Sequence, residues 1–264
     1  LFSHSNDYQQ QWIEDMKSLN REDLFQVIGR EEMQKLYGFE SDGLLVKKGG
    51  YLFPKLICKE MTSHPNINIS YDHCFDSWQK SKSKIDINFL NQNTKSDFDD
   101  LIIANGPGLG KFVSGLKISK GQLVGLKGSQ SIDLELPVNS AGYILPKVDG
   151  ITWIGSTNEK EFQDVEICYK AGNELIERTN INFGIDLVGA EDMLMQARIR
   201  VGSKDRLPLA GPIEKNIYTI GALGSRGFTL GPILGEYIAS LINNSPIPIS
   251  GGVALAIDPL RFKD

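Results

Sequence analysis

The feature that most constrains this chain is a pair of glycine-rich loops, each placed directly after an apolar, strand-like segment. The first loop, Asn105-Gly106-Pro107-Gly108, follows residues 101–104, and the second, 221–229, follows residues 217–220. Glycine at the end of a strand lets the backbone turn sharply and lets a ligand approach it closely. Glycine makes up 27 of 264 residues, above the roughly 7% of average proteins. The alternative is that both loops are tight turns in a crowded sheet.

A helix is predicted directly after the second loop. Residues 231–243 place Leu234, Ile238 and Leu241 on one face and end before Pro246. The N-terminus of a helix that leaves a glycine loop favours negative charge, because its free N–H groups and its dipole converge there. The second loop is therefore a candidate site for an anionic group.

Two arginines between these loops form a third candidate site. Arg198 and Arg200 alternate along a strand-like segment, so they share one face, where a guanidinium can bind a carboxylate in a bidentate way. A solvated or salt-bridged strand edge is the alternative. The lysine clusters are more typical of solvated faces and favour RNA only weakly. These clusters are Lys80, Lys82 and Lys84, and Lys111, Lys117 and Lys120.

Composition excludes several classes of protein. Hydrophobic residues at 41% and charged residues at 23% are typical of a folded globular protein rather than a disordered, collagen-like or coiled-coil chain. The apolar runs are far shorter than the roughly 20 residues that span a bilayer. The formal net charge of −5 argues against non-specific DNA binding. No secretory signal pattern is visible, so we expect a cytoplasmic protein without a membrane partner.

The cysteines and histidines indicate neither a disulfide framework nor a metal site. Three cysteines without CxxC spacing fit a reducing compartment. The three histidines, at positions 4, 64 and 73, are scattered and lack the spacing of metal ligands. The chain begins with Leu1 rather than Met, which we interpret as processing or as part of a longer polypeptide.

The order of patterns predicts a mixed sheet in an α/β or α+β fold. Residues 1–42 read as a helical segment, residues 43–53 as a hairpin, and Pro54 as the start of a helix. Strands are expected at 67–71, 85–89, 98–104, 198–201 and 217–220, and a further helix at 165–179.

The succession of these segments resembles the D-amino-acid-oxidase-like family of FAD-dependent amine oxidoreductases, from about Gly43 onward. The segments that carry the resemblance are 104–106, 120–123, 142–146, 155–157, 200–211, 221–229 and 258–262. Within the family, residues 43–54, the Gly224-Ser225-Arg226-Gly227 loop and the Arg261-Phe262 ending are most similar to the oxidoreductase half of the bifunctional 5-methylaminomethyl-2-thiouridine enzymes of tRNA. The family's opening strand, GxGxxG turn and helix have no counterpart here, so we expect that segment to be missing from this chain.

The resemblance implies two interleaved lobes with the ligand between them. The substrate lobe, with a mixed sheet, would be 43–53 and 111–206, and the remaining part of the flavin lobe would be 54–110 and 207–264. FAD would be bound without a covalent bond to cysteine. The expected partners are the missing N-terminal part of the polypeptide and a substrate, which is either tRNA or a small amine.

The resemblance also implies roles for individual residues. Arg200 matches the arginine that binds the substrate carboxylate, and Tyr143 matches a tyrosine of the same pocket. Residues that match the cofactor site are Ala104, Asn105, Gly106, Gly121, Gln122, Gly224, Ser225, Arg226, Gly227, Phe228 and Thr229. The reaction implied is oxidation of the carboxymethylamino group of 5-carboxymethylaminomethyl-2-thiouridine in tRNA, with release of glyoxylate. The alternatives are an oxidase of a free small amino acid such as glycine or sarcosine, and a non-catalytic fragment without flavin.

Overall fold

The computed structural model describes residues 11, 14–39, 42–81, 84–128, 132–140, 142–189 and 193–263. The chain divides into two compact units. Unit 1 comprises Leu1–Cys58 and Lys120–Arg198, and unit 2 comprises Lys59–Ser119 and Ile199–Asp264. None of the helices in the described ranges is long and apolar enough to cross a membrane.

Unit 1 begins with a two-stranded antiparallel sheet and a short helix. Strand β1 (Phe25–Ile28) pairs with β2 (Gly43–Val46), and α2 (Arg30–Tyr37) lies between them in the chain. The helix ends at Gly38, whose left-handed backbone (φ 74°) suits the residue that follows a helix. Ile28 and Met33 are buried in one apolar cluster with Ile144.

The second sheet of unit 1 has the strand order β11-β7-β10-β9-β8. Its strands are β7 (Leu116–Lys127), β8 (Val138–Asn139), β9 (Tyr143–Ile144), β10 (Ile151–Gly155) and β11 (Leu194–Ser203). Strands β7 and β11 each continue into unit 2. Helix α4 (Tyr169–Phe183) packs on β10, with Leu175 and Ile176 buried against Val124 and Ile154.

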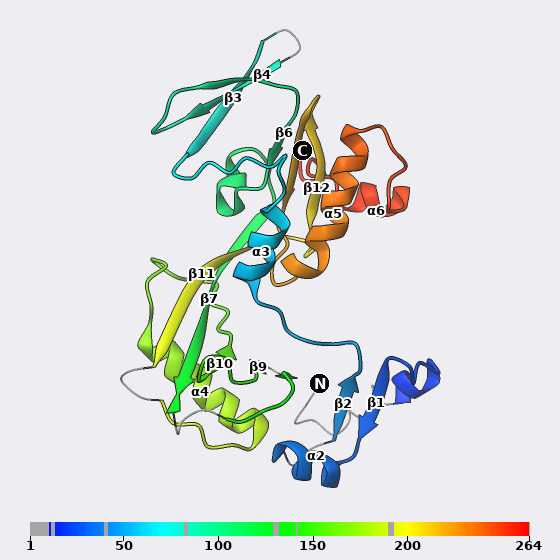
Figure 1. The fold of residues 1–264 in the computed structure, drawn as a ribbon, viewed down its shortest axis with the longest axis vertical. Coiled ribbons are helices and arrows are strands. Elements are labelled where there is room, and N and C mark those ends of the chain that lie inside the picture. Colours follow the sequence, from blue (N-terminus) through cyan, green and yellow to red (C-terminus); the bar gives the residue numbers. More distant parts are fainter. Residues whose placement is uncertain are drawn as a thin grey trace. The chain divides into compact units, whose positions relative to one another are not determined.

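Unit 2 contains two three-stranded sheets (Figure 1). An antiparallel meander is formed by β3 (Phe75–Ser81), β4 (Lys84–Phe89) and β5 (Lys95–Phe98). The other sheet has the order β12-β13-β6, formed by β12 (Leu209–Glu214), β13 (Ile217–Gly221) and β6 (Leu101–Ile103). A 3-10 helix, η1 (Gly106–Lys111), follows β6.

Helix α5 (Gly227–Ile242) packs against β12 and β13 (Figure 1). Its buried face, with Leu234 and Ile238, meets Ala210 and Ile257 in one cluster. The chain ends after α6 (Gly251–Ala256), which is capped by the Ser250 hydroxyl. Helix α3 (Pro54–Thr62) begins at Pro54, as its sequence predicts.

The mixed α/β class is confirmed, and so are strands at 85–89, 198–201 and 217–220. The predicted strand at 98–104 is shorter, and the helices predicted at 165–179 and 231–243 are shifted, to Tyr169–Phe183 and Gly227–Ile242.

Three local predictions are wrong. The stretch 1–42 is not wholly helical, because it contains the strand β1. The predicted hairpin at 43–53 is absent, because β2 pairs with β1 and Tyr51 and Phe53 stay exposed. No strand forms at 67–71, where Ile69 and Tyr71 are exposed, because alternation alone does not make a strand without a partner. Residues 1–10, 12, 13, 40 and 41 of the predicted helical segment lie outside the described residues, and so does Lys82.

The predicted lobe bounds stay a prediction, and the two compact units divide the chain at other residues. Residues 54–58 belong to unit 1, and residues 111–119 and 199–206 belong to unit 2.

Candidate functional site

The two glycine loops begin at the same edge of one sheet in unit 2. Strands β6 and β13 are parallel, with Ile103 opposite Thr219, and the Thr219 hydroxyl donates a 2.8 Å hydrogen bond to the Ile103 carbonyl. The carboxyl ends of neighbouring parallel strands point the same way, and ligands of α/β sheets bind at such ends. We call this place the glycine edge: the loop 104–106 after β6 and the loop 222–227 after β13.

The backbone of the glycine edge leaves room for a ligand. Gly106 and Gly224 adopt left-handed conformations, with φ of 60° and 58°. No atom lies within 4 Å of the position that a Cβ would take at Gly106, Gly224 or Gly227. Side chains at these positions would fill that open space, so glycine keeps the backbone accessible.

Helix α5 starts at the glycine edge without a side-chain cap. Arg226 precedes its first turn and makes no capping hydrogen bond with its side chain. The Thr229 amide donates to the Arg226 carbonyl at 3.2 Å, whereas the amides of Gly227 and Phe228 have no carbonyl partner within the helix, and the positive end of the helix dipole lies there. Open glycines and unmatched amides together fit the phosphate and pyrimidine groups of FAD.

The other predicted cofactor residues of these loops are exposed. Ala104 and Asn105 directly follow β6, and Asn105 precedes η1. Ser225 lies in the loop, while Phe228 and Thr229 are in the first turn of α5. The structure thus brings together all predicted cofactor residues except Gly121 and Gln122, which belong to unit 1.

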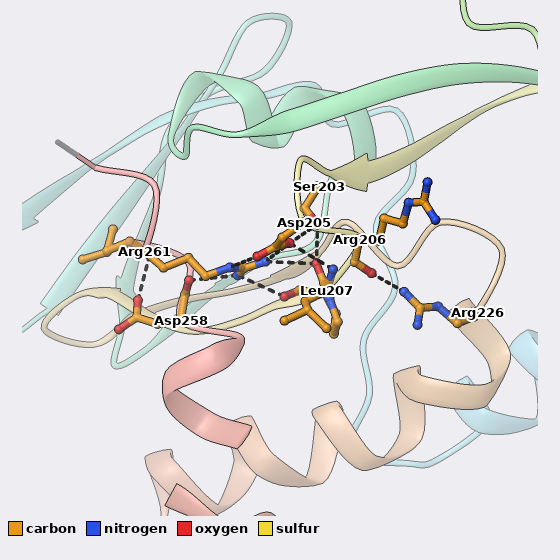
Figure 2. Close-up of polar contacts among 9 residues, drawn as sticks. Ser203, Asp205, Arg206, Leu207, Arg226, Asp258 and Arg261 are labelled. Atoms are coloured by element: carbon orange, nitrogen blue, oxygen red, sulfur yellow. Dashed lines mark hydrogen bonds and ion pairs between the residues drawn. The ribbon is translucent and has the colours of Figure 1, made fainter. Parts of the chain in front are cut away.

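The strand that carries Arg200 is hydrogen-bonded to the glycine edge. Arg200 lies half-buried on β11, and the carbonyl of the next residue, Val201, accepts a 2.8 Å hydrogen bond from the Gly224 amide. A second link joins the same segments, because the Arg226 guanidinium donates to the Arg206 carbonyl (Figure 2). The predicted carboxylate-binding arginine and the predicted flavin loop are therefore held together within unit 2.

The turn after β11 is fixed by an ion pair that sequence reasoning missed. Figure 2 shows Arg261 reaching Asp205: its Nε and Nη2 donate to the two carboxylate oxygens at 2.8 and 2.9 Å. The Ser203 hydroxyl and the Leu207 amide also donate to Asp205, at 2.7 and 3.0 Å. Hydrogen bonds from Arg261 above all, aided by Ser203 and Leu207, hold the pKa of Asp205 well below its ordinary value against the opposing effect of burial.

Tyr143 lies in unit 1, where its position depends on a glycine. Tyr143 on β9 is opposite Gly155 on β10, and a Cβ at Gly155 would overlap the tyrosine ring. The absence of a side chain at residue 155 is what allows the ring to lie across the neighbouring strand.

We expect Gly155→Ala to lower the free energy of unfolding by about 1 to 3 kcal/mol, because the added methyl group displaces the Tyr143 ring. Urea unfolding monitors this change. Gly50→Ala is the matched control in unit 1, since no atom lies within 4 Å of its Cβ position. Equal stability of the two variants would show that the ring does not depend on Gly155.

Gln122 is part of a buried polar network in unit 1. Its side chain is fully buried: Nε2 donates to Glu159 at 2.9 Å, and Oε1 accepts from the Cys168 amide at 2.7 Å. The Thr157 hydroxyl also donates to Glu159, at 2.9 Å, and Lys120 lies 3.9 Å from the same carboxylate. These contacts give Gln122 a structural role, and its predicted part in cofactor binding stays a prediction.

Sequence reasoning overlooked Asp205, Arg261 and Glu159 as ordering residues. The only sequence signals were that Arg261 belongs to the Arg-Phe ending and that Asp205 lies within the 200–211 segment. No cluster of three or more His, Cys, Asp or Glu side chains suited to a metal ion occurs in the ranges described. Cys58, Cys74 and Cys168 are free thiols.

Residues 1–241 match the family described as FAD dependent oxidoreductase. Among curated relatives, the chain is 25% identical to the tRNA 5-methylaminomethyl-2-thiouridine biosynthesis bifunctional protein MnmC of Campylobacter jejuni subsp. doylei, over 86% of this chain and 41% of that protein. The protein of that name from Pseudomonas fluorescens is 23% identical, over 85% of this chain and 40% of that protein. The chain therefore spans about two fifths of the length of these relatives.

Solved structures show the same fold at lower identity. Glycine oxidase from Bacillus cereus superimposes with a TM-score of 0.77 at 16% identity, covering 94% of this chain and 74% of that one. Iminodiacetate oxidase from Chelativorans sp. BNC1 gives a TM-score of 0.75 at 16% identity, covering 97% and 74%. The matching family uses FAD, which is the cofactor that the glycine edge fits. The chain belongs to the FAD-dependent oxidoreductases.

Proposed function

We propose that this chain is the oxidoreductase part of a tRNA-modifying enzyme. Its substrate would be 5-carboxymethylaminomethyl-2-thiouridine in tRNA, and its products glyoxylate and the 5-aminomethyl nucleoside. The observation that carries the proposal is the link between Arg200 and the glycine edge, through the hydrogen bond from the Gly224 amide to the Val201 carbonyl. Relatives named for 5-methylaminomethyl-2-thiouridine biosynthesis support it. We place this activity in the cytoplasm.

FAD, when bound, supplies the two-electron oxidation of the carbon–nitrogen bond, after which water releases glyoxylate. The glycine edge would hold it, with Ala104, Asn105 and Gly106 on one side and residues 224–229 on the other. Arg200 binds the substrate carboxylate through two charge-assisted hydrogen bonds and so fixes the carbon to be oxidised. Tyr143 would line the substrate pocket, with its ring in the space that the absence of a Cβ at Gly155 leaves free.

The second candidate is an oxidase of a free small amino acid such as glycine or sarcosine. The similarity in fold to a glycine oxidase and an iminodiacetate oxidase favours this candidate, and an arginine suits any substrate with a carboxylate.

A chain that binds no flavin is the third candidate, and the visible absorption spectrum tests it. A flavin spectrum after addition of FAD and removal of the excess would exclude this last possibility.

The deciding experiment measures glyoxylate release by the full-length protein that carries these residues. Three substrates are compared at equal concentration: tRNA with the carboxymethylaminomethyl group, glycine and sarcosine. We expect release from the modified tRNA and little from the free amino acids, and tRNA without the modification is the control. Turnover of glycine or sarcosine without turnover of tRNA would establish the second candidate instead.

A further inference from the structure

Three of the lysines that the sequence suggested for RNA, all in unit 2, are paired with carboxylates. Their ion pairs are Lys80 with Glu214 at 2.7 Å, Lys84 with Asp99 at 2.7 Å, and Lys111 with Asp76 at 3.3 Å. A cation that already has a carboxylate partner gains less from a phosphate, because binding must replace one anion with another. These lysines are therefore poor candidates for an RNA contact.

Lys204 and Arg206 differ from these lysines. Both are exposed, and neither has a carboxylate within ion-pair distance among the residues that the structure describes. They flank Asp205, whose charge is matched by Arg261 at 2.8 Å. The turn therefore presents two unmatched positive charges on a surface of a chain whose net charge is −5.

The turn that carries these two residues is unusually well fixed for an exposed segment. The Ser203 carbonyl accepts from the Arg206 amide at 3.3 Å, so Lys204 and Asp205 are the central residues of a β-turn. The Lys204 amide donates to the Gly115 carbonyl at 2.8 Å, and the Arg226 guanidinium donates to the Arg206 carbonyl. Both ends of the turn are thus held in place.

Arg206 has a backbone conformation that favours glycine. Its φ is 66°, in the left-handed region, which a side chain other than that of Gly, Asn or Asp occupies at an energetic cost. In Figure 2 the Arg206 side chain points away from Asp205 and Arg261, and its guanidinium lies on the side of the turn near Arg226. An arginine at a position suited to glycine indicates a use for its side chain.

We propose that Lys204 and Arg206 bind phosphate groups of the RNA next to the nucleoside held at Arg200. This inference rests on the proposed function, since it names the contact that this site makes with tRNA. Lys204 follows Arg200 by four residues along β11 and the turn, a separation of about 13 Å in extended chain. Because the chain as a whole is acidic, RNA binding needs local cations, and phosphate contacts supply affinity without reading sequence.

The test compares Arg206→Gly and Lys204→Ala with the unchanged full-length holoenzyme. Glycine suits φ 66°, so Arg206→Gly removes the charge without straining the turn. We expect each variant to bind modified tRNA about fivefold more weakly at 0.1 M salt, and each to reduce the slope of log affinity against log salt by roughly 0.7 to 0.9. The kcat/KM for a minimal substrate, the free modified nucleoside, should not change.

Two controls separate a phosphate contact from a structural effect. Lys215→Ala removes a charge from the turn between β12 and β13, at the opposite end of β13 from the glycine edge, and should leave the salt slope unchanged. Arg206→Lys should restore most of the tRNA affinity. An unchanged salt slope in both Arg206→Gly and Lys204→Ala would overturn the inference.

The same data distinguish this inference from the proposed function. If the unchanged enzyme turns over modified tRNA but neither variant weakens its binding, only the phosphate contact is wrong. If the unchanged enzyme neither binds nor turns over tRNA, the proposed function fails and the phosphate contact fails with it.

Discussion

Replacing Arg200 with alanine should reduce kcat/KM for the modified tRNA by about 100- to 1000-fold while the flavin content stays the same. Two charge-assisted hydrogen bonds to a carboxylate contribute roughly 3 to 4 kcal/mol, and their loss also leaves the reacting carbon unaligned. Flavin content should persist because the glycine edge is formed by β6, β13 and α5, and the backbone bond from Gly224 to Val201 does not use the arginine side chain. Steady-state glyoxylate release and the visible spectrum measure the two quantities.

Arg198→Ala is the matched control for this prediction. Arg198 lies two residues earlier on the same strand, and its Nη1 donates to the Ala197 carbonyl. We expect Arg198→Ala to retain activity within about threefold, and Arg200→Lys to recover only part of it, because lysine lacks the planar fork. Equal losses at both positions, or parallel loss of flavin and activity in Arg200→Ala, would contradict the assignment of Arg200 to the substrate.

Replacing Arg261 with alanine should lower the free energy of unfolding by about 3 kcal/mol near neutral pH. The Arg261 side chain is only 13% exposed, and beyond Asp205 it donates to the carbonyls of Leu207, Pro208 and Asp258. Its removal leaves the Asp205 carboxylate with the Ser203 hydroxyl and the Leu207 amide alone. Urea unfolding at constant ionic strength measures the loss. A loss below 0.5 kcal/mol would show that the ion pair contributes little.

The pH dependence gives a second test of the same ion pair. Because the pKa of folded Asp205 lies below its ordinary value, the unfolded chain takes up a proton there first as the pH falls. The stabilisation is therefore complete above about pH 5, and it is lost as the pH falls below about 4 toward the folded pKa. In Arg261→Ala this part of the acid dependence should flatten, whereas Arg261→Lys should retain some of it. Identical acid profiles for Arg261→Ala and the unchanged protein would contradict the assignment.

The sequence predicted those elements whose pattern is local. The apolar segment of β13 and the amphipathic face of α5 are visible in a few consecutive residues, and both elements exist near the expected positions. Strand β3 escaped prediction because its residues do not alternate between apolar and polar. Its backbone pairs with the next strand, β4, but two of its side chains, Trp78 and Lys80, reach Glu214, more than 130 residues later.

In the candidate site too, features set by neighbouring residues could be predicted, and contacts between residues far apart in the sequence could not. Each glycine loop could be recognised alone, since each follows an apolar segment. Their adjacency could not, because it depends on the parallel pairing of Ile103 with Thr219. The ion pair of Asp205 with Arg261 likewise joins residues 56 positions apart, and no periodic pattern connects them.

The parallel pairing of β6 with β13 also has a consequence for synthesis on the ribosome. The Thr219 hydroxyl and the Ile103 carbonyl are separated by 116 residues, so this part of the fold has a high contact order and no local precursor. The nascent chain makes β6 well before the strand beside it, because β13 is translated only after more than 100 further residues. Cofactor added to chains that end before residue 217 should therefore give no protection from proteolysis, and capture of FAD must follow the synthesis of β13.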